Sequence, residues 1–249
     1  TAGIGLAAAV ALAREGAQVI VNGRTEARVR AAIEQVRQSA PGAQVQGIAA
    51  DLATAAGCSA VTAQHPRIDV LVNNMGIFEP KPFEQISDAD WLRFFEANVL
   101  SGVRLARHYV PSMRAQNWGR VIFISSESGL QIPTEMIHYG MTKTAQLAVA
   151  RGLAESLAGT QITVNSVLPG PTNSRGVGEF VEALAKADGK SFEAFEKEFF
   201  EKSRPTSLIK RFKEPEEIAA MVAFIASPLS SGTTGAALRV DGGCTKSAF

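Results

Sequence analysis

Short apolar runs rich in β-branched residues alternate with longer helical patterns along this 249-residue chain. The predicted strands are Val19–Val21, Val45–Ala49, Val70–Asn73, Val121–Ser125, Ile162–Leu168 and Ala236–Val240. Helical patterns run through Val29, Ile33 and Val36, and cover about Ala89–Gln116, Tyr139–Ala158 and Pro215–Ala226. This alternation predicts an α/β fold, in which helices cover both faces of a doubly wound parallel sheet. The later strands are apolar almost throughout, which is typical of strands covered on both faces.

Composition excludes several classes of partner. The 25 basic and 24 acidic residues give a formal charge of +1 and form no basic block, so we expect no nucleic acid. The apolar runs are far shorter than the ~20 residues that span a bilayer, so we expect no membrane partner and a cytoplasmic protein. Cys58 and Cys244 are isolated, and the histidines are scattered, so no metal site is expected.

No repeat or linker divides the chain, so residues 1–249 are predicted to form one domain. One segment, at about residues 172–213, lacks a predicted strand. Within it the sequence SFEAFEKEFFEK places Phe192, Phe195, Phe199 and Phe200 at helical spacing, which predicts an amphipathic helix beside the sheet. These phenylalanines either face a substrate, as part of a lid, or pack on the core or on a neighbouring subunit.

The chain begins TAGIG, and Gly3 and Gly5 lead directly into a helical pattern. Glycines at the start of such a helix let a pyrophosphate approach the backbone, and the helix dipole favours its negative charge. A G-x-G pair alone is weak evidence, because an ordinary turn has the same appearance.

A second cofactor signal follows the first predicted strand, where the chain reads NGRTE. An acidic residue at this point of a dinucleotide-binding fold accepts the ribose hydroxyls of NAD. Arg24 stands here instead, and its guanidinium can pair with the 2′-phosphate of NADP. NADP is therefore the predicted cofactor, with NAD as the alternative, unless Arg24 is an ordinary solvated loop residue.

Tyr139 and Lys143 are four residues apart in YGMTK, on one face of a predicted helix. A neighbouring ammonium stabilises phenolate and lowers the pKa of a tyrosine, which suits the phenol to proton transfer. Ser125 and Ser126 end a buried strand, at the sheet edge where open α/β folds bind ligands.

Taken together, the motifs AGIG, NNMG, SSESG, YGMTK, NSVLPGPT and LRVDGG resemble those of the short-chain dehydrogenase/reductase family over essentially the whole chain. The resemblance implies a Rossmann-type fold and a nicotinamide cofactor, which supplies the hydride. In relatives the glycine fingerprint follows a first strand. We therefore expect roughly ten or more residues, enough for that strand and its turn, to precede Thr1 in the natural polypeptide.

The resemblance also implies four catalytic residues. Tyr139 would act as the general acid or base, Lys143 would lower its pKa and bind the nicotinamide ribose, and Ser126 would hydrogen-bond the substrate oxygen. Ser125 is expected to point to the other face of its strand. Asn98 would hold a water in the proton relay behind Lys143, or alternatively its amide stabilises a helix irregularity.

Further residues are implied to bind cofactor or substrate. Those expected at the cofactor are Gly3, Ile4, Gly5, Arg24, Asp51, Leu52, Asn73, Gly76, Tyr139, Lys143, Pro169, Gly170, Thr172 and Ser174. Those expected at the substrate are Ser126, Glu127, Gln131, Met136 and Tyr139, whereas His138 is expected mainly to begin its helix. If the 172–213 segment is a lid, the substrate has an apolar portion.

The expected function is interconversion of a small-molecule ketone or aldehyde with an alcohol by an NADP(H)-dependent oxidoreductase similar to 3-oxoacyl-acyl-carrier-protein reductases. An NAD-dependent alcohol or sugar dehydrogenase is the main alternative, and a cofactor-binding module without catalysis is a third. A methyltransferase shares the sheet and glycine turn but has no use for the Tyr139–Lys143 pair. Like most of the family, the protein is expected to form a homotetramer through its long helices and C-terminal strand.

Overall fold

The computed structural model describes residues 1–174 and 191–248. The strands are β1 (Val19–Gly23), β2 (Val45–Ala49), β3 (Val70–Asn73), β4 (Gly119–Ile124), β5 (Ile162–Pro169) and β6 (Ala237–Val240). The α-helices are α1 (Gly3–Arg14), α2 (Glu26–Ser39), α3 (Ala55–Gln64), α4 (Asp88–Phe95), α5 (Ser101–Gln116), α6 (Ile137–Ser156), α8 (Phe192–Lys202) and α9 (Pro215–Ala226). Residues 175–190 of the lid expected at 172–213 lie outside the described residues.

All strand pairs are parallel, and the hydrogen-bonded ladders form two groups: β1 with β2, and β3-β4-β5-β6 in that order. In the second group Val121 lies opposite both Leu71 and Val164, so apolar side chains line up across the sheet. Every residue of β4 and β5 is buried, which confirms the prediction of strands covered on both faces.

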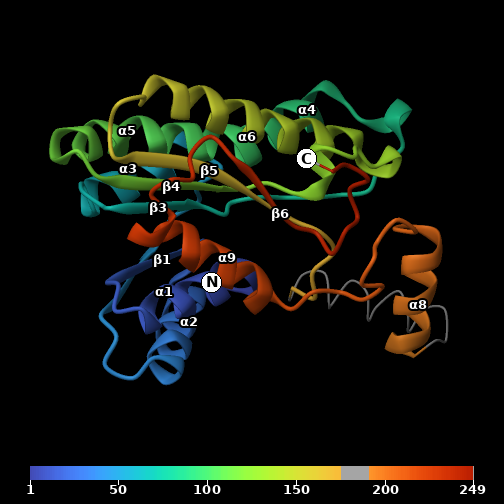
Figure 1. The fold of residues 1–249 in the computed structure, drawn as a ribbon, viewed down its shortest axis with the longest axis horizontal. Helices are drawn as coiled ribbons and strands as arrows, with labels where there is room; N and C mark the ends of the chain where they lie inside the picture. The colour runs from blue at the N-terminus through green and yellow to red at the C-terminus, as the bar shows by residue number, and fades with distance from the viewer. Residues whose placement is uncertain (175–190, 249) are drawn as a thin grey trace.

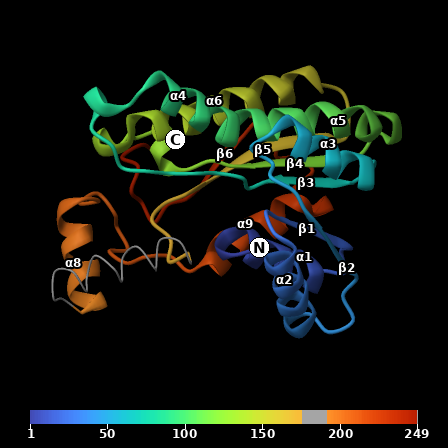
Figure 2. The same ribbon diagram turned by 180° about the vertical axis from the view of Figure 1, so that it is seen from behind.

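Helices cover both faces of the strands, as Figures 1 and 2 show. On one side α1, α2 and α9 pack together; α1 and α2 enclose an apolar core with β1 and β2, and α1 and α9 pack on β4 and β5. On the other side α3, α5 and α6 enclose a second core around Phe123, Tyr109 and Met113. The arrangement is the predicted doubly wound α/β fold.

One predicted helix is not continuous. The pattern at about Ala89–Gln116 forms α4 and α5, separated by a π-helical turn at Glu96–Leu100. The side chain of Asn98, within this turn, bonds the backbone of Ile77 and the hydroxyl of Thr142. These tertiary contacts hold an irregularity that the apolar spacing does not reveal.

The helix predicted in the phenylalanine-rich segment is present as α8, which lies to one side of the layered body (Figures 1 and 2). Its four phenylalanines pack on one another and on Phe212. Phe200 is the most buried of the four, at 1% exposed. The ring of Phe199 lies 5.0 Å from that of Phe212. The described part of the segment therefore has a small aromatic core of its own.

Gly57 provides a test of packing near the start of α3. A Cβ there would overlap the carbonyl oxygen of Asp51, whose backbone cannot rotate away as a side chain would. We expect Gly57→Ala to lower the free energy of unfolding by about 1–3 kcal/mol. The control Gly232→Ala, with no atom within 4 Å of the added methyl, should change it by less than about 0.5 kcal/mol. Urea unfolding of both variants measures this, and equal effects would contradict the packing argument.

Candidate active site

The carboxyl ends of the parallel strands bring the polar residues of the predicted site to one edge of the sheet. Ser125 and Ser126 follow β4 directly and are 3% and 6% exposed. The Ser125 hydroxyl donates to the Lys143 carbonyl oxygen at 2.8 Å, whereas the Ser126 hydroxyl donates to Glu127 Oε2 at 2.6 Å. The two serines therefore have different partners, as their predicted opposite directions imply.

Tyr139 lies in the first turn of α6, with its phenol close to Ser126. The ring of Phe78, 46% exposed, meets that of Tyr139 edge-on at 6.5 Å between centroids. Burial, together with the carboxylate of Glu127, raises the pKa of Tyr139 above its usual range, and a hydrogen bond between the Tyr139 and Ser126 side chains opposes that rise. The phenol is therefore a protonated acid at neutral pH.

Lys143 lies one turn further along α6 and is 5% exposed. Its Nζ donates to the carbonyl of Ile124 at 3.0 Å and to Gln146 Oε1 at 3.2 Å, and lies 5.6 Å from the centroid of the Tyr139 ring. Burial lowers the pKa of Lys143 to about 8, while the charge of Glu127 opposes the shift. The effect of Lys143 on the pKa of Tyr139 stays a prediction, supported by this proximity.

Asn98 lies behind Lys143 and is 1% exposed. Its Oδ1 accepts from Ile77 N at 2.7 Å, and its Nδ2 donates to Ile77 O and to Thr142 Oγ1 at 3.0 and 2.9 Å. Its main-chain carbonyl accepts from Gln146 Nε2 at 2.6 Å. Asn98 therefore lies at a helix irregularity and is joined to Lys143 through Gln146, while its role in a proton relay stays a prediction.

The predicted phosphate-binding glycines lie against the ends of other strands. Gly3 has φ +51°, and a Cβ there would lie 2.8 Å from Cβ of Ser174; a Cβ on Gly5 would lie 2.5 Å from Nδ2 of Asn74. Ala2, at the N-cap of α1, offers no capping side chain. Among the described residues, the first N–H groups of this helix therefore have neither a side-chain cap nor an intrahelical acceptor.

The other predicted cofactor residues surround this helix start and the adjoining strand ends. Arg24 is exposed directly after β1, and Asp51 is exposed in the loop after β2. A Cβ on Gly76 would lie 3.4 Å from Lys143 Nζ, and Thr172 Oγ1 donates to Gly170 O at 2.8 Å. Among the described residues, the side chain of Asn73 is 5% exposed and has no hydrogen-bond partner.

The residues predicted to contact the substrate differ in how far they are exposed to solvent. Glu127 is buried, Met136 is half-buried and Gln131 is exposed. His138 is 0% exposed and packs against Phe94 at 4.0 Å between ring centroids, inside the first turn of α6. His138 was expected to begin its helix; it is the second residue of α6, which begins at Ile137.

Three residues that sequence reasoning missed approach this site. Gln146, three positions after Lys143, could have been found from helical spacing, whereas Arg204 and Lys213 had no such signal. Arg204 Nε lies 3.2 Å from Glu127 Oε1, and Arg204 Nη1 lies 3.3 Å from Glu135 Oε1. Lys213 Nζ is buried beside Gly170 and Gly242, without a hydrogen-bond partner among the described residues.

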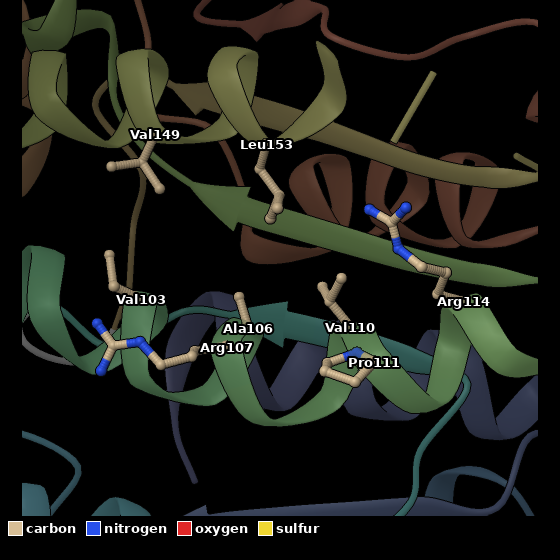
Figure 3. A pocket seen from close by; sticks show the side chains of 8 residues that line it. All are labelled: Val103, Ala106, Arg107, Val110, Pro111, Arg114, Val149 and Leu153. Atoms are coloured by element: carbon tan, nitrogen blue, oxygen red, sulfur yellow. The ribbon is translucent and has the colours of Figure 1, made fainter. Parts of the chain in front are cut away.

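A hollow of about 510 Å³ lies between α5 and α6, away from Tyr139. Figure 3 shows Val149 and Leu153 of α6 opposite Val103, Ala106 and Val110 of α5. Over the described ranges, no helix is long and apolar enough to cross a membrane, and no three acidic, histidine or cysteine side chains are placed to hold a metal ion.

Comparison with known proteins assigns the chain to a family. It matches the family model described as enoyl-(acyl carrier protein) reductase over residues 1–245. It is 47% identical to the uncharacterized oxidoreductase YvaG of Bacillus subtilis, over 100% of this chain and 94% of that protein. It is 30% identical to the 3-oxoacyl-acyl-carrier-protein reductase FabG of Aquifex aeolicus, over 98% of this chain and 93% of the relative.

The solved structure of L-sorbose reductase from Gluconobacter frateurii, complexed with NADPH and L-sorbose, has a TM-score of 0.92 and 31% identity, covering 99% of this chain and 94% of that one. The structural similarity therefore extends over nearly the whole chain. The protein therefore belongs to the short-chain dehydrogenase/reductase family of oxidoreductases.

Proposed function

We propose that the protein interconverts a small-molecule ketone or aldehyde and the corresponding alcohol, with NADP(H) as its cofactor and with residues 1–249 as one catalytic domain. The observation that carries this proposal is the meeting of Ser126, Tyr139 and Lys143 at one sheet edge, beside the glycine-led start of α1. Lys143 and Tyr139 come from one helix, whereas Ser126 comes from the end of β4.

NADP(H) supplies the hydride when it is bound. Tyr139 donates a proton to the carbonyl oxygen, and the Ser126 hydroxyl donates a hydrogen bond to the same oxygen as negative charge develops there. The ammonium of Lys143 stabilises the phenolate that Tyr139 becomes. In the direction of oxidation, Tyr139 takes the proton back.

The residues around α1 fit a dinucleotide. Gly3 has a positive φ that favours glycine, and a helix start without a side-chain cap favours a pyrophosphate. Asn73, at the end of β3, stays a proposed cofactor residue, and its buried amide has no hydrogen-bond partner among the described residues. Exposed Arg24 favours NADP, and the NADPH bound to L-sorbose reductase supports the same choice by analogy.

The alternatives remain distinct. An NAD-dependent alcohol or sugar dehydrogenase would have the same catalytic residues but no use for Arg24. A module without catalysis would have no use for the Tyr139 phenol.

We also propose that the substrate has an apolar portion and that copies of the chain assemble through α5 and α6. Phe78, exposed beside Tyr139, supports a substrate with an apolar portion. The apolar hollow between α5 and α6 supports pairing of copies through these helices, as the predicted homotetramer requires. The cytoplasmic location stays a prediction from sequence.

Tyr139→Phe tests the catalytic proposal. Removal of the phenol hydroxyl should lower kcat for NADPH-dependent ketone reduction by about 10²- to 10⁴-fold, because the proton donor is lost. NADPH binding, measured by fluorescence, should persist. The other tyrosine provides the control: Tyr109→Phe removes a hydroxyl that bonds His65 O, so it should lower stability by about 1 kcal/mol but retain activity. Full activity of Tyr139→Phe would mean that a different acid donates the proton, and a wild type that reduces no ketone would favour the module.

The pKa of Lys143 predicts how activity depends on pH. Its ammonium is present below about pH 8 and is lost above it, whereas the phenol of Tyr139, with its raised pKa, remains protonated. We expect kcat/KM for reduction to fall as pH rises through about 8, because kcat/KM reports the ionisation of the free enzyme. A profile that stays flat up to pH of about 10 would contradict this role of Lys143.

Arg24→Asp tests the cofactor. The substitution replaces a guanidinium that pairs with the 2′-phosphate by a carboxylate that repels it, so the ratio of kcat/KM for NADPH over NADH should fall by about 10- to 100-fold. Arg30→Asp, an equal charge change at an exposed position on α2, should leave that ratio near the parent value. A wild-type preference for NADH, with no response to Arg24→Asp, would support the NAD-dependent alternative.

A further inference from the structure

The hydroxyl that would bind the substrate oxygen is already engaged. Ser126 Oγ donates to Glu127 Oε2 at 2.6 Å and accepts from Ser128 N at 3.1 Å. A hydroxyl has one proton, so Ser126 cannot donate to a carbonyl oxygen while it donates to Glu127. Ketone binding must therefore take this hydrogen bond away from Glu127.

Glu127 cannot easily turn away to find another donor. Its side chain is 7% exposed, and its Oε1 lies 3.2 Å from Arg204 Nε, in an ion pair that spans 77 positions of the chain. Arg204, with its side chain 13% exposed, also lies 3.3 Å from Glu135 Oε1 and donates to Ser203 O at 2.8 Å. Arg204 thus fixes one carboxylate oxygen and leaves Oε2 facing Ser126.

Resting on the proposed function, we propose that Glu127 binds a hydroxyl on the carbon next to the reacting carbonyl, so that the substrates are α-hydroxy ketones. In such a ketone the two oxygens lie roughly one hydrogen-bond length apart, as Ser126 Oγ and Glu127 Oε2 do. Ser126 donates to the carbonyl oxygen, and the substrate hydroxyl donates to Oε2. The substrate restores to Glu127 the hydrogen bond that Ser126 withdraws.

A plain ketone lacks that donor and leaves a buried carboxylate oxygen without its hydrogen bond, which selects against it. An α-keto acid fits less well still, because its carboxylate would approach Glu127, and Arg204 already has both Glu127 and Glu135 as partners. Arg204 is accordingly a positioning residue for Glu127. The apolar side of the substrate faces Phe78, across the phenol of Tyr139.

The reaction leaves the recognised hydroxyl intact. The carbonyl carbon gains a hydride from NADPH, and its oxygen gains the proton of Tyr139, so that 1-hydroxybutan-2-one becomes butane-1,2-diol and NADPH becomes NADP⁺. Tyr139 then regains a proton from solvent.

Three ketones of similar size test the inference: 1-hydroxybutan-2-one; pentan-3-one, in which a methyl replaces the hydroxyl; and 2-oxobutanoate, in which a carboxylate replaces the CH2OH group. For the wild type, kcat/KM should be about 10- to 100-fold higher for the hydroxy ketone than for pentan-3-one, because one hydrogen bond to a charged group separates them. 2-Oxobutanoate should be the poorest of the three.

Substitutions test whether Glu127 causes the preference for the hydroxy ketone over pentan-3-one. Glu127→Ala should bring the ratio of hydroxy ketone to pentan-3-one close to one, and the more conservative Glu127→Gln should lower it about 3- to 10-fold, because the amide oxygen is a weaker acceptor. Glu135→Gln removes a charge that contacts Arg204 but not Ser126, and should preserve the ratio. Calorimetric titration of hydroxy ketone and pentan-3-one into the enzyme saturated with NADP⁺ should show the same preference without turnover.

The outcomes separate this inference from the function on which it rests. Equal kcat/KM for the hydroxy ketone and pentan-3-one, a preference that survives both Glu127 substitutions, or a preference for 2-oxobutanoate would each overturn the inference and leave the carbonyl reductase intact. Reduction of none of a broad panel of ketones and aldehydes would overturn both.

Discussion

The buried ammonium of Lys143 is the constraint on which the rest of the site depends. A charge removed from water costs several kcal/mol unless it is well hydrogen-bonded. Here the Ile124 carbonyl at the end of β4 and the Gln146 side chain on α6 supply the acceptors. Gln146 in turn donates to the Asn98 carbonyl within the π-helical turn. The buried ammonium thereby connects the end of β4, α6 and the π-helical turn. These contacts hold the Lys143 side chain beside Tyr139.

An ion pair connects the chain beyond α8 to the same site. Arg204 follows α8 and its phenylalanine core, yet its guanidinium reaches Glu127, next to the Ser126 hydroxyl. The two linkages differ in kind. The Lys143 network uses neutral acceptors and leaves a charge to act on Tyr139, whereas Arg204 and Glu127 balance each other and leave one carboxylate oxygen as an acceptor. In the mechanism proposed above, the first would serve proton transfer and the second would serve substrate recognition.

Much of this arrangement could be predicted from sequence because it depends on local patterns. Apolar runs located the strands, although β4 begins at Gly119 rather than Val121, and helical spacing located α6 and α8. The strand ends brought Ser126 to the expected edge. The apolar spacing did not reveal the π-helical turn, although a helix irregularity at Asn98 was one of the two expectations for that residue, because the i→i+5 turn is held by Ile77 and Thr142, which are distant in sequence. Arg204 was missed because nothing local distinguishes it from a solvated arginine.

The most direct test of the central claim follows the hydride itself. Two preparations of NADPH, each with deuterium on a different face of C4, are incubated separately with the protein and a reducible hydroxy ketone. The alcohol product of each reaction is analysed by mass spectrometry. The account predicts that the product contains one deuterium with one of the two NADPH preparations and none with the other. Formation of alcohol without deuterium from either face would contradict hydride transfer at this site.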